Sequence, residues 1–492
     1  MRSICCGSIA LLLAALPVTA QSDPTVRVRL LGSESYQEIE VEAVSDIVRI
    51  EVDEREAGAL RSGERVTIAR SSSRVTASFG NQSMSGQTVR VLGQRLRLRV
   101  GRIDREYAGE LAVRSVGSKL DIVNASPLRP YVASVVAAEL GFDVPEAAKA
   151  QAVLARTYAL RRLGSNPTYD LDDHQGSQVF RGVGTITATS HLAAESTEGV
   201  VMTYSGRLAD GTYFSSSGGH TADNESTWSS TPVPYLRGVP DPYDEGSPHH
   251  SWETSIPRPQ ALSALSSVVG TGATGIVIEE RSRSGRVTRM HALGASRPAI
   301  TGAQFRRRIN AAKGWRTVKS TKFDLSLEGD QYVLRGGGFG HGVGMSQYGA
   351  MGQARLGRDY RHILAHYFTG AVLEGGHALP SPPVAVSEPI RTPSEDRQES
   401  LGLHGQYLLL DPRGRVTQDR PGSGSGGSPP GDARRETAPS SKDDRTGERR
   451  SGRDRREASG RAGPGRRQST DRRQTVQETP PAPETTQRRA AW

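Results

Sequence analysis

The chain of 492 residues has only two cysteines, Cys5 and Cys6. Both lie in residues 1–20, where a positive charge, an apolar run and small closing residues are typical of a cleaved signal peptide. Once these residues are removed no thiol is left, which excludes a disulfide, a cysteine nucleophile and a thiolate metal ligand. We therefore expect an exported chain that is stabilised by an ordinary apolar core.

Long apolar runs are also missing after residue 20, so we expect no transmembrane helix; an uncleaved membrane anchor at the N terminus is the alternative. Basic residues, in contrast, are in excess, and the net charge is +10. Much of it comes from the Arg-rich end after about residue 400. Because an exported chain seldom meets nucleic acid, we expect no nucleic-acid partner.

Three regions follow the signal peptide. In residues 21–104 apolar residues alternate with polar ones, which predicts a β-rich region. Residues 105–372 mix helical periodicity with short strands, so we expect an α+β domain in which a helical hairpin packs on mixed β structure. Residues 381–492 are rich in Arg, Pro, Gly and Ser and lack apolar periodicity, which predicts a disordered tail.

The helical hairpin has clear start and stop signals. The apolar pattern predicts a first helix at 127–140, with Ser126 as N-cap and Gly141 as the stop. A second helix is expected at 145–162, capped by Asp143.

One carboxylate lies on the apolar face of the first helix. That face consists of Leu128, Val132, Val135 and Val136. Glu139 shares the face and occupies the last turn, where burial and the helix dipole both disfavour the ionised form. A raised pKa would suit a general acid. In the alternative, Glu139 pairs with a cation such as Arg156 and only holds the hairpin together; the residues alone leave both open.

Other motifs give weaker signals. Gln151 falls in the apolar stripe of the second helix and needs hydrogen-bond partners, either a substrate or the backbone. Ser217 and His220 are close in sequence, but the Gly-x-Ser-x-Gly elbow of a serine hydrolase is missing. The Gly-rich run 336–344 lacks the pattern of a phosphate-binding loop, so we expect its glycines to permit close approach of the backbone.

Three blocks of sequence resemble the stage II sporulation protein D family, which also contains amidase enhancers. The blocks are the hairpin segments 127–140 and 146–159, the Ser/Gly segment 213–221 and the Gly-His-Gly segment 338–350. They occur in the order of the family and together span about residues 105–372.

The resemblance implies lytic transglycosylase chemistry on peptidoglycan glycan strands that lack stem peptides, with Glu139 as the catalytic residue. A lone carboxyl is enough when no water takes part, since it can protonate the glycosidic oxygen and then deprotonate the 6-hydroxyl of the sugar, giving a 1,6-anhydro end. Arg156 matches the arginine of the family motif. The candidates for substrate binding are Gln151, Arg156, Ser215, Ser216, Ser217, His220, His341, Gln347 and Tyr348.

Some relatives carry a cysteine linked to a bound metal at the position of Ser177, and its absence here argues against zinc. Asp172, Asp173 and His174 have no recognised ligand spacing, so we expect no metal or other cofactor. The rival interpretation is a non-catalytic glycan-binding module that recruits or stimulates a cell-wall amidase. The basic tail would suit anionic wall polymers. We expect a periplasmic or wall-associated location.

Overall fold

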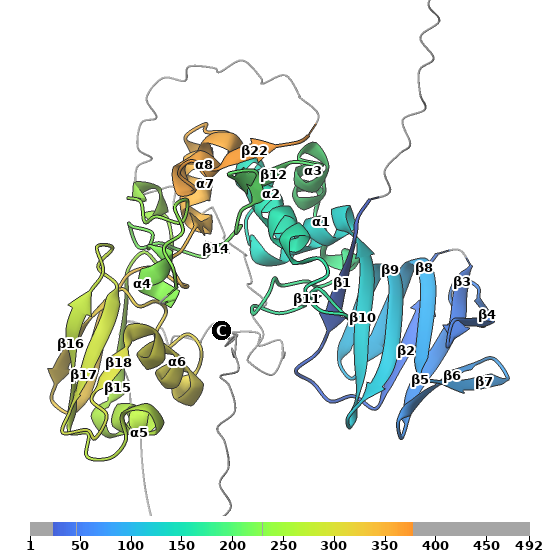
Figure 1. Ribbon diagram of the computed structural model, residues 1–492, viewed down its shortest axis with the longest axis horizontal. Helices are drawn as coiled ribbons and strands as arrows, with labels where there is room; N and C mark the ends of the chain where they lie inside the picture. The colour runs from blue at the N-terminus through green and yellow to red at the C-terminus, as the bar shows by residue number, and fades with distance from the viewer. Residues whose placement is uncertain (1–22, 46, 229, 377–492) are drawn as a thin grey trace, which may run out of the picture. The chain divides into compact units, whose positions relative to one another are not determined.

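The computed structural model describes residues 23–376 except 46 and 229 (Figure 1). The expected signal peptide, 1–20, and the expected tail, 381–492, lie outside these residues. The described part contains 22 strands and eight α-helices, which confirms the α+β class. No helix within it is long and apolar enough to cross a membrane.

A large sheet forms the first part of the described chain (Figure 1). Its order is β11-β1-β10-β9-β8-β2-β5-β6-β7, with β3 paired to β8 and β4 to β3. Its pairs are antiparallel except for β1 with β11. The strands are β1 Thr25–Leu30, β2 Glu38–Ala43, β3 Val48–Val52, β4 Arg55–Leu60, β5 Arg65–Ser71, β6 Arg74–Phe79, β7 Gln82–Gly86, β8 Thr88–Val100, β9 Ile103–Val116, β10 Lys119–Pro127 and β11 Leu171–Asp172.

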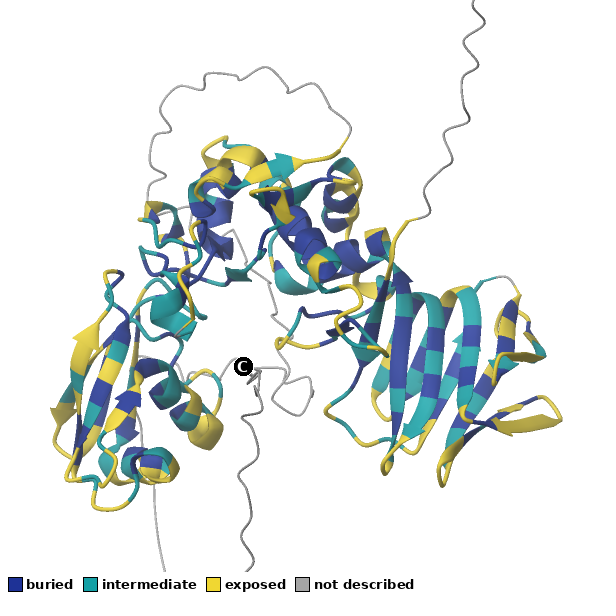
Figure 2. Ribbon diagram, viewed as in Figure 1, coloured by how far each residue is buried: buried dark blue, intermediate teal, exposed yellow. Residues whose placement is uncertain are grey.

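Alternation of apolar and polar residues produces these strands, because successive side chains point to opposite faces. In β1 and β2 every second residue is buried, and the same alternation is visible along the sheet (Figure 2). The buried face belongs to one core with the helices that follow. The boundary that we predicted at residues 104 and 105 falls inside β9, within this sheet, and the β-rich part continues to Pro127.

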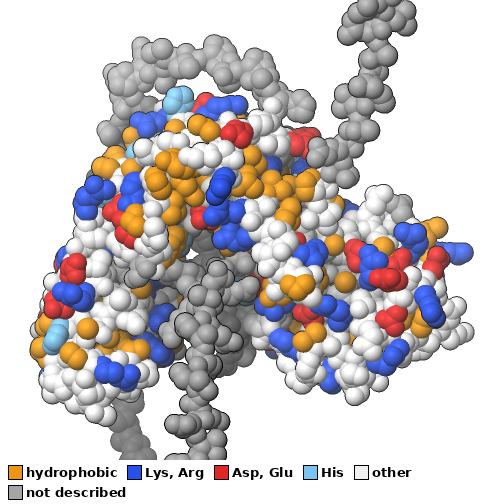
Figure 3. Space-filling view, viewed as in Figure 1, with side chains coloured by type: hydrophobic (Ala, Val, Ile, Leu, Met, Phe, Trp, Pro, Cys, Tyr) orange, Lys and Arg blue, Asp and Glu red, His pale blue; other side chains and the backbone are white. Residues whose placement is uncertain are grey.

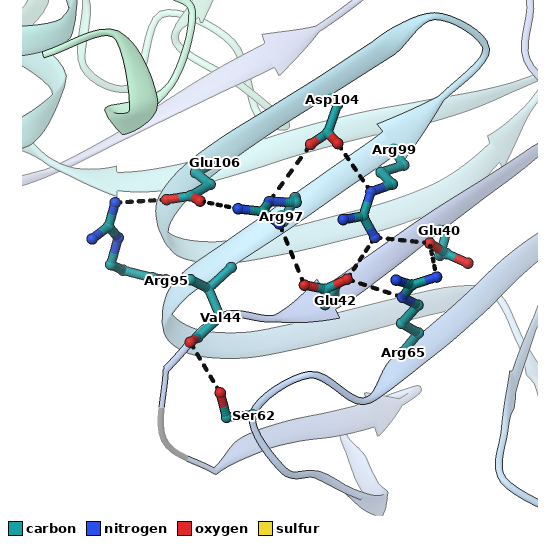
Figure 4. Close-up of polar contacts among 10 residues, drawn as sticks. All are labelled: Glu40, Glu42, Val44, Ser62, Arg65, Arg95, Arg97, Arg99, Asp104 and Glu106. Atoms are coloured by element: carbon teal, nitrogen blue, oxygen red, sulfur yellow. Dashed lines mark hydrogen bonds and ion pairs between the residues drawn. The ribbon is translucent and has the colours of Figure 1, made fainter.

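Arginine and carboxylate side chains form a network on the sheet (Figure 4). Glu42 on β2 lies 2.5 Å from Arg99 on β8 and 2.9 Å from Arg65 on β5. Arg99 also lies 3.1 Å from Asp104 on β9. Basic and acidic side chains intermingle over this part of the surface (Figure 3). Opposite charges on neighbouring strands favour the observed pairing of the strands.

The predicted hairpin is present as α1 (Leu128–Glu139) and α2 (Pro145–Arg162), but both predicted caps are wrong. Ser126 lies in β10, paired with β1, because the strand runs directly into α1; Pro127 is the N-cap. Val144 is the N-cap of α2. The carboxylate of Asp143 instead accepts a hydrogen bond from Thr189.

Short helices and strands surround the hairpin, and α2 packs against α3, α7 and α8. The small residues of α2 permit this close packing, since its alanines are buried. The sequence pattern did not predict α3 and α4. The elements are η1 Val183–Thr185, α3 Ala188–Ser196, β12 Val201–Tyr204, β13 Arg207–Leu208, β14 Tyr213–Phe214, α4 Asn224–Trp228, η2 Pro242–Asp244, β21 Met345–Ser346, α7 Gln347–Arg355, α8 Tyr360–Tyr367 and β22 Val372–Glu374.

Residues 252–336 have a core of their own, and we call them the inserted module. Two three-stranded sheets, β15-β20-β19 and β16-β17-β18, pack with α5 and α6 around side chains such as Phe305 and Leu334. The sequence pattern did not predict a separate module here. Its elements are β15 Trp252–Pro257, α5 Arg258–Val269, β16 Gly275–Arg281, β17 Val287–Leu293, β18 Ala299–Thr301, α6 Gly302–Lys313, β19 Phe323–Glu328 and β20 Gln331–Gly336.

We expect Glu42→Gln to lower the free energy of unfolding by about 1 kcal/mol at neutral pH and low salt, because the network loses its shared anion. Hydrogen bonds, foremost that from Arg99, hold the pKa of Glu42 below 4.5. This contribution is therefore present above pH 4.5 and is lost as the pH falls through the lower pKa of the folded state. Urea unfolding would measure it, with Glu38→Gln on the same strand as control. Equal effects of both substitutions would contradict the network's role.

Candidate active site around Glu139

Glu139 is the last residue of α1, and the fold holds both its backbone and its side chain. The apolar residues that precede it on the same face, Val132 and Val135 among them, are buried, whereas Glu139 itself is half-buried. Gln347 on α7 donates from Nε2 to the Glu139 carbonyl oxygen at 3.0 Å, which satisfies an acceptor left open at the helix end. The backbone N–H of Val179 donates to Oε1 of Glu139 at 2.7 Å.

Burial raises the pKa of the Glu139 carboxyl from 4.5 to about 7. The N–H of Val179, the hydroxyl of Tyr213 and the charge of Arg181 act in the opposite direction, since each stabilises the carboxylate. The direction agrees with the expectation from sequence, and burial is the main cause. Both protonation states are populated near neutral pH, as a group that gives up a proton and takes one back requires.

Tyr131 and Gln178 set the position of the Tyr213 hydroxyl, which lies next to the Glu139 carboxyl. Tyr131 donates from its hydroxyl to Oε1 of Gln178 at 2.9 Å, and Nε2 of Gln178 donates to the hydroxyl oxygen of Tyr213 at 3.2 Å. The hydroxyl hydrogen of Tyr213 is thus left for Glu139. Burial raises the pKa of both tyrosines well above 10, so both remain neutral donors. We missed all three residues as site candidates, although each lies within or beside a segment that we compared with the family.

His341 contacts Tyr213 and not the carboxyl. Its Nε2 lies 3.0 Å from the carbonyl oxygen of Tyr213, and its Nδ1 lies 3.1 Å from the backbone nitrogen of Val343. These partners assign the hydrogen to Nε2, since Nδ1 must accept. Burial lowers the pKa of His341 to about 3, so the ring is neutral. His341 thereby positions β14, which carries Tyr213.

Three of the predicted binding residues, Gln151, Gln347 and Tyr348, lie near Glu139. Gln151 is buried on α2, and its Oε1 lies 3.5 Å from Nε2 of Gln347, a long and weak contact. The backbone N–H of Tyr348 donates to the carbonyl oxygen of Ser215 at 3.0 Å, and the Tyr348 ring lies 5.7 Å from that of Phe142. Their contact with a substrate stays a prediction.

The Ser/Gly loop closes around a buried carboxylate that sequence analysis missed, Asp244 in η2. Ser216 donates to both oxygens of Asp244 at 3.0 Å, and Ser217 donates to one at 3.1 Å. The N–H of Gly218 adds a bond of 2.6 Å. Ser216 and Ser217 are buried, so this geometry favours a structural role for them. Ser215 is half-buried, which leaves it more open to a ligand.

The serine hydrolase interpretation is wrong, because Ser217 and His220 form hydrogen bonds with other groups. The Ser217 hydroxyl donates to Asp244 and accepts from the N–H of Gly219 at 3.0 Å. Nδ1 of His220 instead donates to the carbonyl oxygen of Thr221 at 2.7 Å. The two side chains therefore do not form the nucleophile and base of a hydrolase.

Arg156 does not pair with Glu139, which removes the alternative in which the two only join the helices. Its guanidinium is buried and donates to the carbonyl oxygens of Ala194 at 2.9 Å and Val200 at 3.1 Å, and to Thr197 at 3.3 Å. Burial lowers the pKa of Arg156 to about 10, so it stays charged near neutral pH. These bonds fasten α2 to α3 and the strand that follows it.

The residues at the position of the metal-linked cysteine do not fit zinc. The Ser177 hydroxyl accepts a hydrogen bond from the N–H of Asp172 at 3.1 Å, and the Asp172 carboxylate lies 2.7 Å from Arg29. Asp173 is buried near Arg181. Across the described residues no three His, Cys, Asp or Glu side chains are close enough to hold a metal ion.

Comparisons with known proteins match two segments of the chain. Residues 116–204, which include Glu139, match the family described as stage II sporulation protein, and residues 245–344, which include the inserted module, match a domain of unknown function (DUF8618). Stage II sporulation protein D of Bacillus subtilis is 30% identical over 272 residues, which cover 51% of this chain and 76% of that protein. An uncharacterized protein of Brachyspira hyodysenteriae is 32% identical over 272 residues, 54% of this chain and 71% of that protein. The amidase enhancer of B. subtilis is 30% identical over 275 residues, 46% of this chain and 38% of that protein.

We expect Glu139→Gln to stabilise the folded chain above pH 7. Because the pKa of Glu139 is raised to about 7 in the folded chain, the protonated side chain contributes to stability below pH 4.5. This contribution is lost as the pH rises through 7. The neutral amide avoids this loss, on the order of 1–3 kcal/mol, and can still accept from Val179. Urea unfolding at acid and alkaline pH would measure it, with exposed Glu195→Gln as control. A variant less stable than wild type at every pH would contradict the burial argument.

Proposed function

This chain belongs to the stage II sporulation protein D family, and from that membership and the site around Glu139 we propose that it is an exported lytic transglycosylase. Its substrate would be peptidoglycan glycan strands that lack stem peptides. The observation that carries the proposal is one half-buried carboxyl whose pKa is about 7. The described groups that most shift this pKa are an amide, a hydroxyl and a guanidinium; none is a second carboxylate.

In the first step the protonated Glu139 gives its proton to the glycosidic oxygen while the bond from that oxygen to the anomeric carbon breaks. The leaving strand departs with a free hydroxyl, and positive charge develops at the anomeric carbon. Glu139 is now a carboxylate. The N–H of Val179 and the hydroxyl of Tyr213 stabilise this form, as their effect on the pKa indicates.

In the second step the carboxylate removes the proton of the sugar's 6-hydroxyl, and the 6-oxygen bonds to the anomeric carbon. The product has a 1,6-anhydro end and Glu139 is again protonated, so protons balance without water. Glycosidases that use water require a second carboxylate to activate or replace it. One carboxyl that exchanges its proton near neutral pH is sufficient for the intramolecular reaction.

A second candidate is non-catalytic: a glycan-binding protein that recruits or stimulates a cell-wall amidase. The observation that favours it is the 30% identity to a protein named amidase enhancer. In both cases we propose a location in the periplasm or at the wall, no cofactor, and contact of the basic residues 381–492 with anionic wall polymers.

Digestion of peptide-free glycan strands by wild type, Glu139→Gln and the control Glu195→Gln would test the proposal, with mass spectrometry of the products. We expect anhydro-ended fragments from wild type and the control. Loss of the acid should slow cleavage by a factor on the order of 10²–10⁴ in Glu139→Gln. A folded wild type that cleaves no strand but raises the rate of an added amidase would move the function to the second candidate.

A further inference from the structure

The inserted module contacts the Gly-rich loop, residues 336–344, through its backbone. The N–H of Gly340 donates to the carbonyl oxygen of Lys319 at 3.1 Å. The N–H of Gly337 donates to the carbonyl oxygen of Lys322 at 2.9 Å. A change in the module can therefore be transmitted to this loop.

One buried cation of the module, Arg286, lies against the same loop. It directly precedes β17 and is 2% exposed. A Cβ at Gly342 would lie 2.5 Å from its guanidinium carbon, so the backbone of the loop packs directly on the charged group. Nη2 donates to the carbonyl oxygen of Ser217 at 3.3 Å, whereas Nε and Nη1 have no hydrogen-bond partner among the described residues. Burial lowers the pKa of Arg286 to about 10, so it stays charged near neutral pH.

A charge held in this way costs stability. Burial of a cation is unfavourable unless hydrogen bonds or an ion pair compensate for the lost hydration. Within the described part of the chain, two of the three guanidinium nitrogens lack a partner and no carboxylate lies within ion-pair distance of Arg286. A buried polar group without partners needs an explanation, and proteins retain such groups at functional sites.

The charge of Arg286 acts on the residue that precedes Gly342 in the loop, His341. Burial, Arg306 on α6 and Arg286 lower the pKa of this ring to about 3. The rings of Phe214 and Trp228 pack on it, with 5.4 and 5.3 Å between ring centres, and carry no charge. Two cations of the inserted module thus act together with burial to keep His341 neutral.

The hydrogen bonds of His341 fit only the neutral ring with its hydrogen on Nε2. Nδ1 accepts from the N–H of Val343 at 3.1 Å, and Nε2 donates to the carbonyl oxygen of Tyr213 at 3.0 Å. Protonation would place a second hydrogen on Nδ1, facing the N–H of Val343, and would break that contact. The backbone of Tyr213 would then lose a fixed support, and with it the hydroxyl beside Glu139.

We propose that Arg286 is a positioning residue for the reaction at Glu139: its guanidinium, packed on the loop at Gly342, holds the His341 ring in the tautomer that supports Tyr213. This inference rests on the proposed function. It gives the inserted module a part in the reaction, which the module plays through the Gly-rich loop.

The first test follows the His341 ring by nitrogen-15 NMR, which reports tautomer and protonation and needs no substrate; His341→Gln identifies its signals. In wild type we expect a neutral ring with hydrogen on Nε2 down to about pH 4. Arg286→Met removes the charge but keeps an unbranched chain. The ring should then titrate at a higher pH, because one of two repelling charges is gone. Arg286→Lys retains the charge and should restore the wild-type titration.

The second test is cleavage of peptide-free strands. Arg286→Met should lower kcat on the order of ten-fold and change KM less than about two-fold, because a misplaced Tyr213 affects the chemical step. The pH above which kcat/KM falls should be higher than in wild type, since a weaker hydrogen bond from Tyr213 lowers the pKa of Glu139 less. Arg307→Met, at an exposed position of α6, is the matched control and should change none of these values.

Urea unfolding separates positioning from a purely structural role. Because Arg286→Met removes an uncompensated buried charge, the variant should be at least as stable as wild type at neutral pH. A less stable variant would overturn the inference, and so would a His341 titration that is the same in wild type and Arg286→Met. A wild-type ring that carries its hydrogen on Nδ1, or that titrates near pH 6.5, would overturn it without any variant.

The two proposals can fail separately. If wild type cleaves no strand but His341 titrates at a higher pH in Arg286→Met, the proposed function is contradicted and the control of His341 by Arg286 is supported. If wild type cleaves strands and Arg286→Met has the kcat and pH profile of wild type, the proposed function stands and this inference is overturned.

Discussion

A carboxyl group that has lost much of its hydration lies at the end of α1, and the neighbouring elements are arranged so that the fold tolerates it. Burial of such a group disfavours its charge. Hydrogen bonds from Val179 and Tyr213 limit that penalty without cancelling it, which leaves a pKa of about 7. The large sheet, through β10, sets where α1 begins, and α7 supplies Gln347 to close its end. The proposed chemistry depends on this balance.

Two of the segments that resemble the family, 213–221 and 338–350, contact each other closely and hold each other in place. The Ser/Gly loop is held by Asp244, and the Gly-rich loop lies directly against it: a Cβ at Gly338, whose φ is +79°, would lie 2.7 Å from the Ser216 carbonyl oxygen. A side chain at Gly342 would similarly collide with Arg286, at 2.5 Å. Glycine is required at both places because backbone and guanidinium approach so closely. These contacts hold the Ser/Gly loop, which follows the strand that carries Tyr213, against the Gly-rich loop, and Arg286 links the Gly-rich loop to the inserted module.

Local pattern predicted the elements whose structure is decided locally. The helical hairpin, its apolar face and the place of Glu139 on it follow from periodicity and from the stop at Gly141. Ser126 is not a cap because it pairs with β1, and Asp143 is not a cap because it accepts a hydrogen bond from Thr189. Neither partner is visible in a short segment of sequence. Tertiary contacts outweigh local propensity at such positions.

The residues that form hydrogen bonds with Glu139 are hard to predict for a related reason. Val179 lies 40 residues from Glu139 along the chain, and Gln347 lies 208 residues away. Gln347 was nominated through the family resemblance, whereas Tyr213 and Gln178 carried no pattern that separates a site residue from a core residue. The inserted module was missed because alternation in its short strands does not reveal that they close around a second core.

For the proposed reaction Glu139 must be protonated when it meets the glycan, and Tyr213 helps to set its pKa. The dependence of kcat/KM on pH, measured on peptide-free strands for wild type and Tyr213→Phe, tests this most directly. We expect a kcat/KM that falls above pH 7 in wild type, with the fall moved to higher pH in the variant, because the hydroxyl lowers the pKa of Glu139. A fall that stays at the same pH in both proteins, or a rate that rises above pH 7, would contradict it.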